Sequence, residues 1–280
     1  MATNVTNLGV EGLRSINRYF FYQLVAVILT IIAEIIVFTL IGSASSIAGA
    51  ALQSAQGAGS MVLILIALLV IIEIVLLVFS VYALLSLMFG IRDLRRSQFK
   101  NSAAYAGISK WLKWLVILSV ILVAIIAVVV LALIVSVATS FVGSFIGSYS
   151  GLGAGSASAG SGAQAYFSML LIFTFLLMVV ELVFGWKLST LYKKLSSDVS
   201  QKPLNTAGNL LLASIVILFI GGLISLANGF SSAVSLYTSV GAGSTGLDLV
   251  SAIIGFVGLI VSAASLYLGW TGTSAALRKQ

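Results

Sequence analysis

Residues 61–90 read MVLILIALLVIIEIVLLVFSVYALLSLMFG, a run of thirty residues in which Glu73 is the only charged side chain. An α-helix needs roughly 20 apolar residues to cross the hydrocarbon core of a bilayer, which is about 30 Å thick. This stretch is therefore long enough to span a membrane. Its additional length can be accommodated by tilt or by projection beyond the bilayer.

Five other stretches have the same apolar character and are also long enough to cross a bilayer. They comprise residues 19–42, 111–142, 166–190, 209–229 and 248–271. Hydrophobic residues make up 60% of the chain and charged residues 8%, so it cannot cover the surface of a water-soluble domain with polar groups. We therefore expect an all-α integral membrane protein whose six transmembrane helices form a single transmembrane domain over residues 1–280.

The fourteen Lys and Arg residues all lie on one side of these six stretches. They occupy residues 1–18, 91–113, 187–208 and the C-terminal tail, whereas the connections 43–60, 143–165 and 230–247 hold no charged residue. Because Lys and Arg are retained in cytoplasmic loops, this distribution predicts cytoplasmic N- and C-termini and three helical hairpins that point outward. The four tryptophans lie near the same inner ends, as an interfacial aromatic belt requires.

The net charge of +7 would suggest nucleic acid as a partner in a soluble protein. Here the basic residues flank apolar stretches, so we expect anionic lipid headgroups on the cytoplasmic side and no nucleic acid. The candidate lipid contacts are four residues that follow the second stretch, Arg92, Arg95, Arg96 and Lys100. The same residues are equally well explained as charges that only set the topology.

Three landmarks recur along the chain at similar intervals. Each outer connection contains Gly-Ala-Gly-Ser, at residues 57–60, 153–156 and 241–244. The second, fourth and sixth stretches each end near a glycine, namely Gly90, Gly185 and Gly269, and a basic pair follows within a dozen residues. Similarity at a fixed period is typical of repeat architecture, so we predict a threefold repeat with units 8–100, 101–200 and 201–280. Because Gly, Ala and Ser are abundant here, chance coincidence of short motifs is the alternative.

Glu34 and Glu73 are the carboxylates deepest within the predicted spans. They lie about 15 and 17 residues from the inner ends of their helices, hence roughly 22–26 Å from the cytoplasmic face. Two carboxyls close together in a low dielectric would share a proton, which makes this pair a candidate proton or ion site. The alternative is two separate carboxyls that are neutral or hydrogen-bonded to Ser, Thr or backbone groups.

Glu181 lies nearer the inner end of the fourth stretch, about 9 Å along the helix axis from Lys187. A lysine at this position can extend to the interface, so we predict a structural ion pair of Glu181 with Lys187, the alternative partner being a basic residue of another apolar stretch.

Small residues predict close helix packing in the third stretch and beyond. Gly143, Gly147, Gly151 and Gly155 recur every fourth residue and would form a stripe if the helix continued outward. Such faces favour packing within the chain, or a homo- or hetero-oligomer. A flexible Gly/Ser loop is the alternative beyond Gly147.

The chain has no Cys and no His, which removes thiol nucleophiles, the commonest general base and the commonest metal ligand. The apolar stretches hold no His, and their only aspartate is Asp248, at the outer edge of the last stretch. They therefore support neither intramembrane catalysis by a Ser–His pair nor catalysis by two aspartates. We therefore expect no catalytic residue, cofactor or metal ion.

The segment EGLRSIN at residues 11–17, followed at once by an apolar stretch, resembles the opening of an archaeal family of multi-span membrane proteins of unknown function. That family is frequent in thermoacidophiles. The resemblance implies a polytopic fold and residence in the plasma membrane, and it implies no activity.

Taken together, these features predict a non-enzymatic scaffold or an accessory subunit of a membrane assembly, because intramembrane polar groups are few and small-residue packing sites are abundant. The alternative is a proton- or cation-coupled transporter or channel that uses Glu34 and Glu73.

Overall fold

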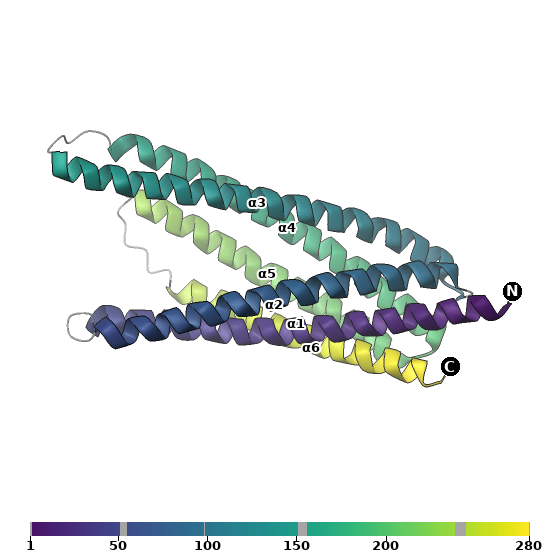
Figure 1. Cartoon of the computed structure of the whole chain (residues 1–280). Coiled ribbons are helices and arrows are strands. Elements are labelled where there is room, and N and C mark those ends of the chain that lie inside the picture. Colours follow the sequence, from purple (N-terminus) through teal and green to yellow (C-terminus); the bar gives the residue numbers. More distant parts are fainter. Residues whose placement is uncertain (1, 51–54, 98, 151–155, 239–244, 280) are drawn as a thin grey trace. The chain divides into compact units, whose positions relative to one another are not determined.

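The computed structural model describes residues 2–50, 55–97, 99–150, 156–238 and 245–279, and every regular element among them is an α-helix (Figure 1). The helices are α1 (Ala2–Ala50), α2 (Ala55–Arg96), α3 (Ser102–Ser150), α4 (Ser156–Val199), α5 (Lys202–Thr238) and α6 (Thr245–Leu277). Each contains an apolar stretch of 26 to 32 described residues that is long enough to cross a bilayer. The prediction of an all-α fold with six membrane-spanning helices is confirmed, and the chain is a multi-pass membrane protein.

The helices are longer than the sequence predicted. We expected the charge-free segments 43–60, 143–165 and 230–247 to be loops, but α1 continues to Ala50, α3 to Ser150 and α5 to Thr238. The chain's single proline, the residue that interrupts a helix most strongly, lies elsewhere, at position 203. Gly and Ser therefore lower the helix propensity of residues 43–50, 143–150 and 230–238 without interrupting the helices there.

The connections on the basic side are short. Between α4 and α5, Ser200 has a left-handed backbone (φ 53°), and the Gln201 N–H donates to the Ser196 carbonyl at 3.2 Å. This bond spans five residues, as in the Schellman motif that ends many helices. Pro203 then stands in the first turn of α5, where its missing N–H costs no helical hydrogen bond.

The contacts between Cα atoms divide the chain into two compact units, each described here by itself. Unit 1 comprises Met1–Lys110, Leu188–Ser214 and Gly258–Gln280. Unit 2 comprises Trp111–Lys187 and Ile215–Val257.

Within unit 1, α1 and α2 run antiparallel and side by side (Figure 1). Near the basic end, Gly12 packs against Leu94, and Gly90 packs against Ile16. Ile16 and Leu94 are both fully buried. Glycine lets the two backbones approach closely at both points, which is the usual way for membrane helices to gain packing contacts.

An aromatic cluster joins α1 to α4 and α6 in unit 1. Phe20 is fully buried, and its ring lies 4.8 Å from the Tyr192 ring of α4, measured between centroids. The Tyr192 hydroxyl is 3.4 Å from that of Tyr19. On the α6 side, Phe20 packs against Gly269, where no other residue would leave room for the ring.

In unit 2, α4 packs between α3 and α5. Leu115 and Leu122 of α3 form a buried apolar cluster with Val180 of α4. On another side of α4, the Ile215 side chain of α5 packs against Gly185.

The three glycines of the predicted repeat are all buried, and each is a point of close helix approach. Gly90 and Gly269 both meet α1, at Ile16 and Phe20, whereas Gly185 meets α5. Gly90 thus packs on the helix that precedes its own, while Gly185 packs on the helix that follows. The three glycines thus all permit close helix packing, but the pairs of helices that they join are not equivalent. The threefold repeat stays a prediction.

Gly269→Ala is expected to destabilise the protein by about 1–3 kcal/mol, because overpacking a filled core has a cost of this size. The added Cβ would overlap the Phe20 ring, which is enclosed and cannot move aside. The measurement is unfolding in mixed detergent micelles, followed by circular dichroism. Gly107→Ala is the matched control, since a Cβ there meets nothing within 4 Å. A Gly269→Ala variant as stable as this control would show that the contact is not tight.

Candidate functional site

Glu34 and Glu73 are both exposed on the surfaces of their helices. The residue before each of them is buried: Ala33 is 6% exposed and Ile72 is 8% exposed. Continuing the antiparallel register set by the glycine contacts along α1 and α2 brings Ala33 level with Glu73 and Glu34 level with Ile72. By this register the two glutamates lie about one residue, or about 1.5 Å, apart in height on neighbouring helices.

The surroundings of these glutamates are apolar. Ile35, Ile74 and Leu77 are exposed on the same helices, the last at 66%. Among the described residues, neither glutamate takes part in an ion pair. Both carboxyls thus have exposed apolar neighbours on their own helices, and the shared-proton site stays a hypothesis.

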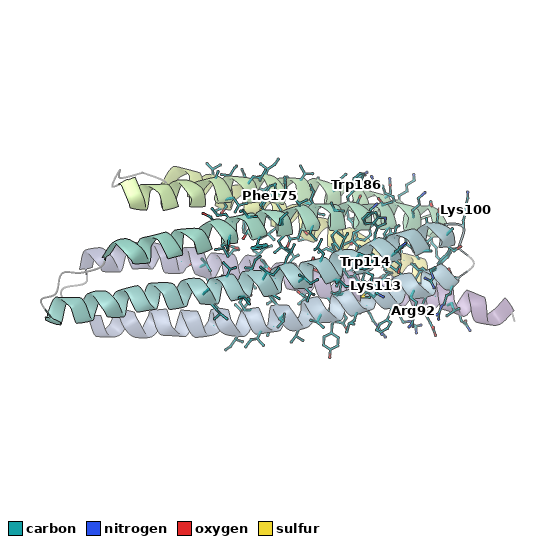
Figure 2. The ribbon with its side chains drawn as sticks, turned by 90° about the horizontal axis from the view of Figure 1, so that it is seen from above. Arg92, Lys100, Lys113, Trp114, Phe175 and Trp186 are labelled. Atoms are coloured by element: carbon teal, nitrogen blue, oxygen red, sulfur yellow. The ribbon has the colours of Figure 1, made fainter. Side chains whose placement is uncertain are left out.

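The predicted ion pair between Glu181 and Lys187 is not formed among the described residues. Six residues correspond to about 240° around an α-helix, so the two side chains leave α4 in different directions. The Lys187 ammonium instead lies over the Trp111 ring, 5.0 Å from its centroid, and 5.8 Å from that of Trp186. Trp186, which is labelled in Figure 2, is 61% exposed, and Glu181 is exposed as well.

The predicted lipid contacts are exposed at the end of α2 and just beyond it. Arg92 is partly neutralised, because its Nε lies 3.3 Å from the Asp93 carboxylate and its guanidinium stacks 5.1 Å from the Phe89 ring centroid. Arg95, Arg96 and Lys100 are also exposed; Arg92 and Lys100 are labelled in Figure 2. This group is available to anionic headgroups.

The glycine stripe is only partly described. Helix α3 extends to Ser150 and so includes Gly143 and Gly147. Gly151 and Gly155 lie outside the described residues.

Sequence reasoning missed a polar contact that joins the first and last helices within unit 1. The Asn17 side-chain oxygen accepts hydrogen bonds from Thr273 at 2.7 Å and from Ser274 at 3.0 Å. Thr273 is fully buried. Asn17 is the last residue of the EGLRSIN segment, and Thr273 lies four residues after Gly269. Both are therefore close to a motif that the sequence shows, but neither motif indicates that the two residues are in contact.

A second missed contact holds the connection between α2 and α3. Asp198 of α4 accepts hydrogen bonds from the Asn101 amide at 2.7 Å and from the Tyr105 hydroxyl at 2.5 Å. Tyr105 is fully buried, and Asn101 also donates to the Lys194 carbonyl. These hydrogen bonds hold the first turn of α3 and the residue before it against the end of α4.

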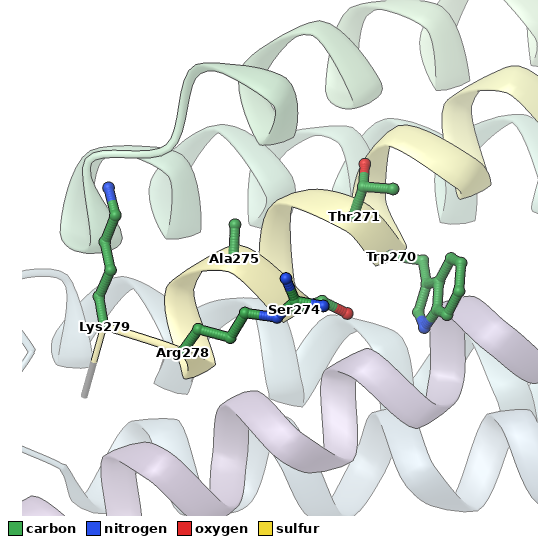
Figure 3. Close-up of a pocket in the computed structure, with 6 residues that line it drawn as sticks. All are labelled: Trp270, Thr271, Ser274, Ala275, Arg278 and Lys279. Carbon is green, nitrogen blue, oxygen red and sulfur yellow. The ribbon is translucent and has the colours of Figure 1, made fainter.

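A hollow of about 490 Å³ lies along the last turns of α6 (Figure 3). Its lining residues are Trp270, Thr271, Ser274, Ala275, Arg278 and Lys279. Figure 3 shows the Arg278 side chain running back along α6 toward Ser274. Two cations and an indole ring can contact an anionic headgroup, but a surface from a single helix does not enclose a substrate.

Within the described part of the chain, no three acidic side chains gather in an arrangement able to hold a metal ion. Comparison of the chain with protein-family models, with curated proteins and with solved structures finds no match. The interpretation of its function therefore depends on the site geometry.

Thr273→Val is expected to lower stability by about 0.5–1.5 kcal/mol, the usual size of an interhelical hydrogen bond in a membrane protein. The substitution preserves the shape of a fully buried side chain and removes its hydrogen bond to Asn17. Mixed-micelle unfolding measures the change.

Thr271→Val is the matched control, because the Thr271 hydroxyl donates only within its own helix, to the carbonyls of Tyr267 and Leu268. Equal stability of the two variants would contradict a bridging role for Thr273.

Proposed function

We propose that this multi-pass membrane protein is a non-enzymatic scaffold or an accessory subunit of a membrane assembly. The observation that carries the proposal is the exposure of Glu34 and Glu73 on an apolar helix surface. Ionisable residues that work in transport face the interior of a bundle or a water-filled cavity. Carboxyls displayed outward are better suited to contacts with another protein.

The interior polar groups support the same proposal. The buried hydroxyl of Ser189 donates to the Gly208 carbonyl at 2.7 Å, and that of Ser265 donates to the Ala207 carbonyl at 2.7 Å. These bonds join neighbouring helices of unit 1 and leave the hydroxyls engaged in packing. Such side chains act as glue between membrane helices and supply no relay of titratable groups.

We further propose residence in the plasma membrane with both termini in the cytoplasm. The positive-inside distribution of Lys and Arg supports the orientation, and the resemblance of residues 11–17 to the archaeal membrane family supports the location. Arg95, Arg96 and Lys100 would then contact anionic headgroups, at about 1 kcal/mol for each residue near the surface.

Transport of protons or cations through Glu34 and Glu73 is the second candidate. The observation in its favour is that the two glutamates lie at similar height on adjacent helices. It requires a partner or a conformational change that encloses them.

The orientation is testable because the chain contains no cysteine. In sealed right-side-out vesicles, a membrane-impermeant maleimide is expected to label Ser156→Cys and to leave Lys100→Cys unlabelled until the vesicles are opened. Ser156 begins α4 at the charge-free end, whereas Lys100 lies in the basic connection. The reverse labelling pattern would invert the proposed topology.

The assembly role predicts that the protein leaves its own membrane in mild detergent as a complex heavier than the 29.2 kDa chain, as measured by native mass spectrometry. It also predicts no proton or cation flux above that of empty liposomes. Flux that Glu34→Gln and Glu73→Gln abolish, and that Glu181→Gln retains, would instead establish transport.

A further inference from the structure

The hollow along the last turns of α6 changes in character along the helix (Figure 3). Arg278 and Lys279 are exposed at the end of the helix, Thr271 and Ser274 lie one to two turns earlier, and Trp270 lies deepest. All of these residues belong to unit 1, so the hollow is described within a single unit. Its volume of about 490 Å³ lies within the usual range of small-ligand sites, about 300–1,000 Å³.

We infer that this hollow binds one molecule of an anionic phospholipid whose headgroup carries free hydroxyl groups, as in a phosphatidylglycerol. The inference goes beyond the proposed assembly role and does not depend on it. It also differs from the general headgroup contact proposed for Arg95, Arg96 and Lys100, because the hollow combines cations, hydrogen-bond acceptors and an apolar surface at one place.

The two cations of the hollow are available to a phosphate. Among the described residues, neither Arg278 nor Lys279 takes part in an ion pair. Cations that follow a helix often neutralise its last carbonyls, but two carbonyls of this last turn already accept backbone N–H groups at 3.2 Å. Figure 3 shows the Arg278 side chain running back along α6, away from the helix end. A guanidinium in this position can bind phosphate through two parallel hydrogen bonds.

The hollow also lies at the depth of lipid headgroups. Tryptophan side chains mark the boundary between hydrocarbon and headgroups. Ser274, toward which the Arg278 side chain runs, is four residues or about 6 Å beyond Trp270 along the helix axis. The headgroup layer is about 5–8 Å thick on each side of a bilayer. The guanidinium is therefore within the layer that contains the phosphates.

An aromatic ledge, formed by Phe21, Tyr267 and Trp270, continues the hollow toward the hydrocarbon. Phe21 of α1 and Tyr267 of α6 are 45% and 53% exposed, and each ring centroid lies 6.3 Å from that of Trp270. An acyl chain can lie along this ledge while its phosphate binds the cations above. A soluble phosphate compound or an acidic peptide has no part that would use the ledge, so a lipid fits the hollow best.

The hydroxyls of the hollow favour one kind of headgroup. The Ser274 hydroxyl donates to Asn17 at 3.0 Å, and the Thr271 hydroxyl donates within its own helix. Because a hydroxyl has one proton and two acceptor positions, both oxygens can only accept further hydrogen bonds. An ionised phosphate has no proton to give them, whereas a glycerol hydroxyl has. A phosphatidylcholine headgroup has no net charge and no hydroxyl, and so uses neither the cations nor these acceptors fully.

The test follows lipid contact at Trp270 by fluorescence quenching. Trp111→Phe, Trp114→Phe and Trp186→Phe leave Trp270 as the only tryptophan of the full-length chain. The protein is reconstituted in phosphatidylcholine bilayers that contain increasing fractions of a second lipid with brominated acyl chains. The quenching curve gives the affinity of that lipid for the hollow relative to phosphatidylcholine.

Phosphatidylglycerol is expected to bind roughly 25-fold more tightly than phosphatidylcholine, because each of two basic residues at the membrane surface contributes about fivefold. Arg278→Gln with Lys279→Gln should remove most of this preference. The matched control is Lys193→Gln with Lys194→Gln, which removes two exposed cations of α4 and should retain the preference. Unchanged circular dichroism verifies that the variants are folded.

The hydroxyl requirement has its own probe. Phosphatidylmethanol carries the same charge as phosphatidylglycerol and no hydroxyl, and it is expected to bind about 2- to 10-fold more weakly, the range for one net hydrogen bond. Thr271→Val, which removes one of the two acceptors, should narrow this difference. Equal binding of the two lipids by the unsubstituted hollow would overturn the assignment of the headgroup.

Two outcomes would overturn the lipid site itself: equal quenching by brominated phosphatidylglycerol and brominated phosphatidylcholine, or an equal loss of preference in both charge variants. Quenching that soluble glycerol phosphate relieves would identify a water-soluble ligand in place of a lipid. If the three Phe substitutions unfold the chain, native mass spectrometry of phosphatidylglycerol retained by the charge variants makes the same comparison. A native complex that persists in Arg278→Gln with Lys279→Gln leaves the assembly role intact, whichever result the lipids give.

Discussion

Hydrocarbon provides no partner for a peptide N–H or C=O, so the backbone of an apolar stretch must satisfy its hydrogen bonds within its own helix. The six helices follow from this constraint. The described connections on the basic side complete their bonding locally, as between α4 and α5, where the Gln201 N–H closes the turn on the Ser196 carbonyl. The backbone thus leaves its helical hydrogen bonding where Lys and Arg mark the membrane edge.

The same constraint acts on side-chain hydroxyls. Thr30 and Ser119 donate to carbonyls four residues earlier in their own helices, at 3.0 and 2.9 Å. Ser189 and Ser265 instead donate to carbonyls of α5 and thereby bind helices together. A hydroxyl always has a carbonyl within reach in this way. A carboxylate that faces outward does not, and this difference separates the structural polar groups of the chain from Glu34 and Glu73.

Sequence was sufficient for the number of membrane-spanning helices and for their apolar cores, because both depend on composition over 20 or more residues. It misplaced the helix ends, since weak propensity in the Gly/Ala/Ser segments was interpreted as loop. It also did not predict the direction in which any glutamate side chain leaves its helix. A helix that is apolar all round has no polar stripe from which to deduce its packed side. Glu181 and Lys187 were paired by axial distance alone, whereas rotation around α4 brings Lys187 to Trp111. The contacts of Asn17 required knowledge that the first and last helices meet.

Helix length offers a final argument about how this protein meets its surroundings. Helices α1 and α3 each contain 49 residues, which corresponds to about 73 Å, against about 40–45 Å for a bilayer with its headgroups. From Lys113, the last basic residue of α3, to Ser150 the helix runs about 55 Å, so it tilts or continues beyond the membrane on the charge-free side. Residues 114–150 hold no charged side chain. Either arrangement therefore moves no ionised group into hydrocarbon, and the basic end alone fixes how far the helix can shift across the bilayer.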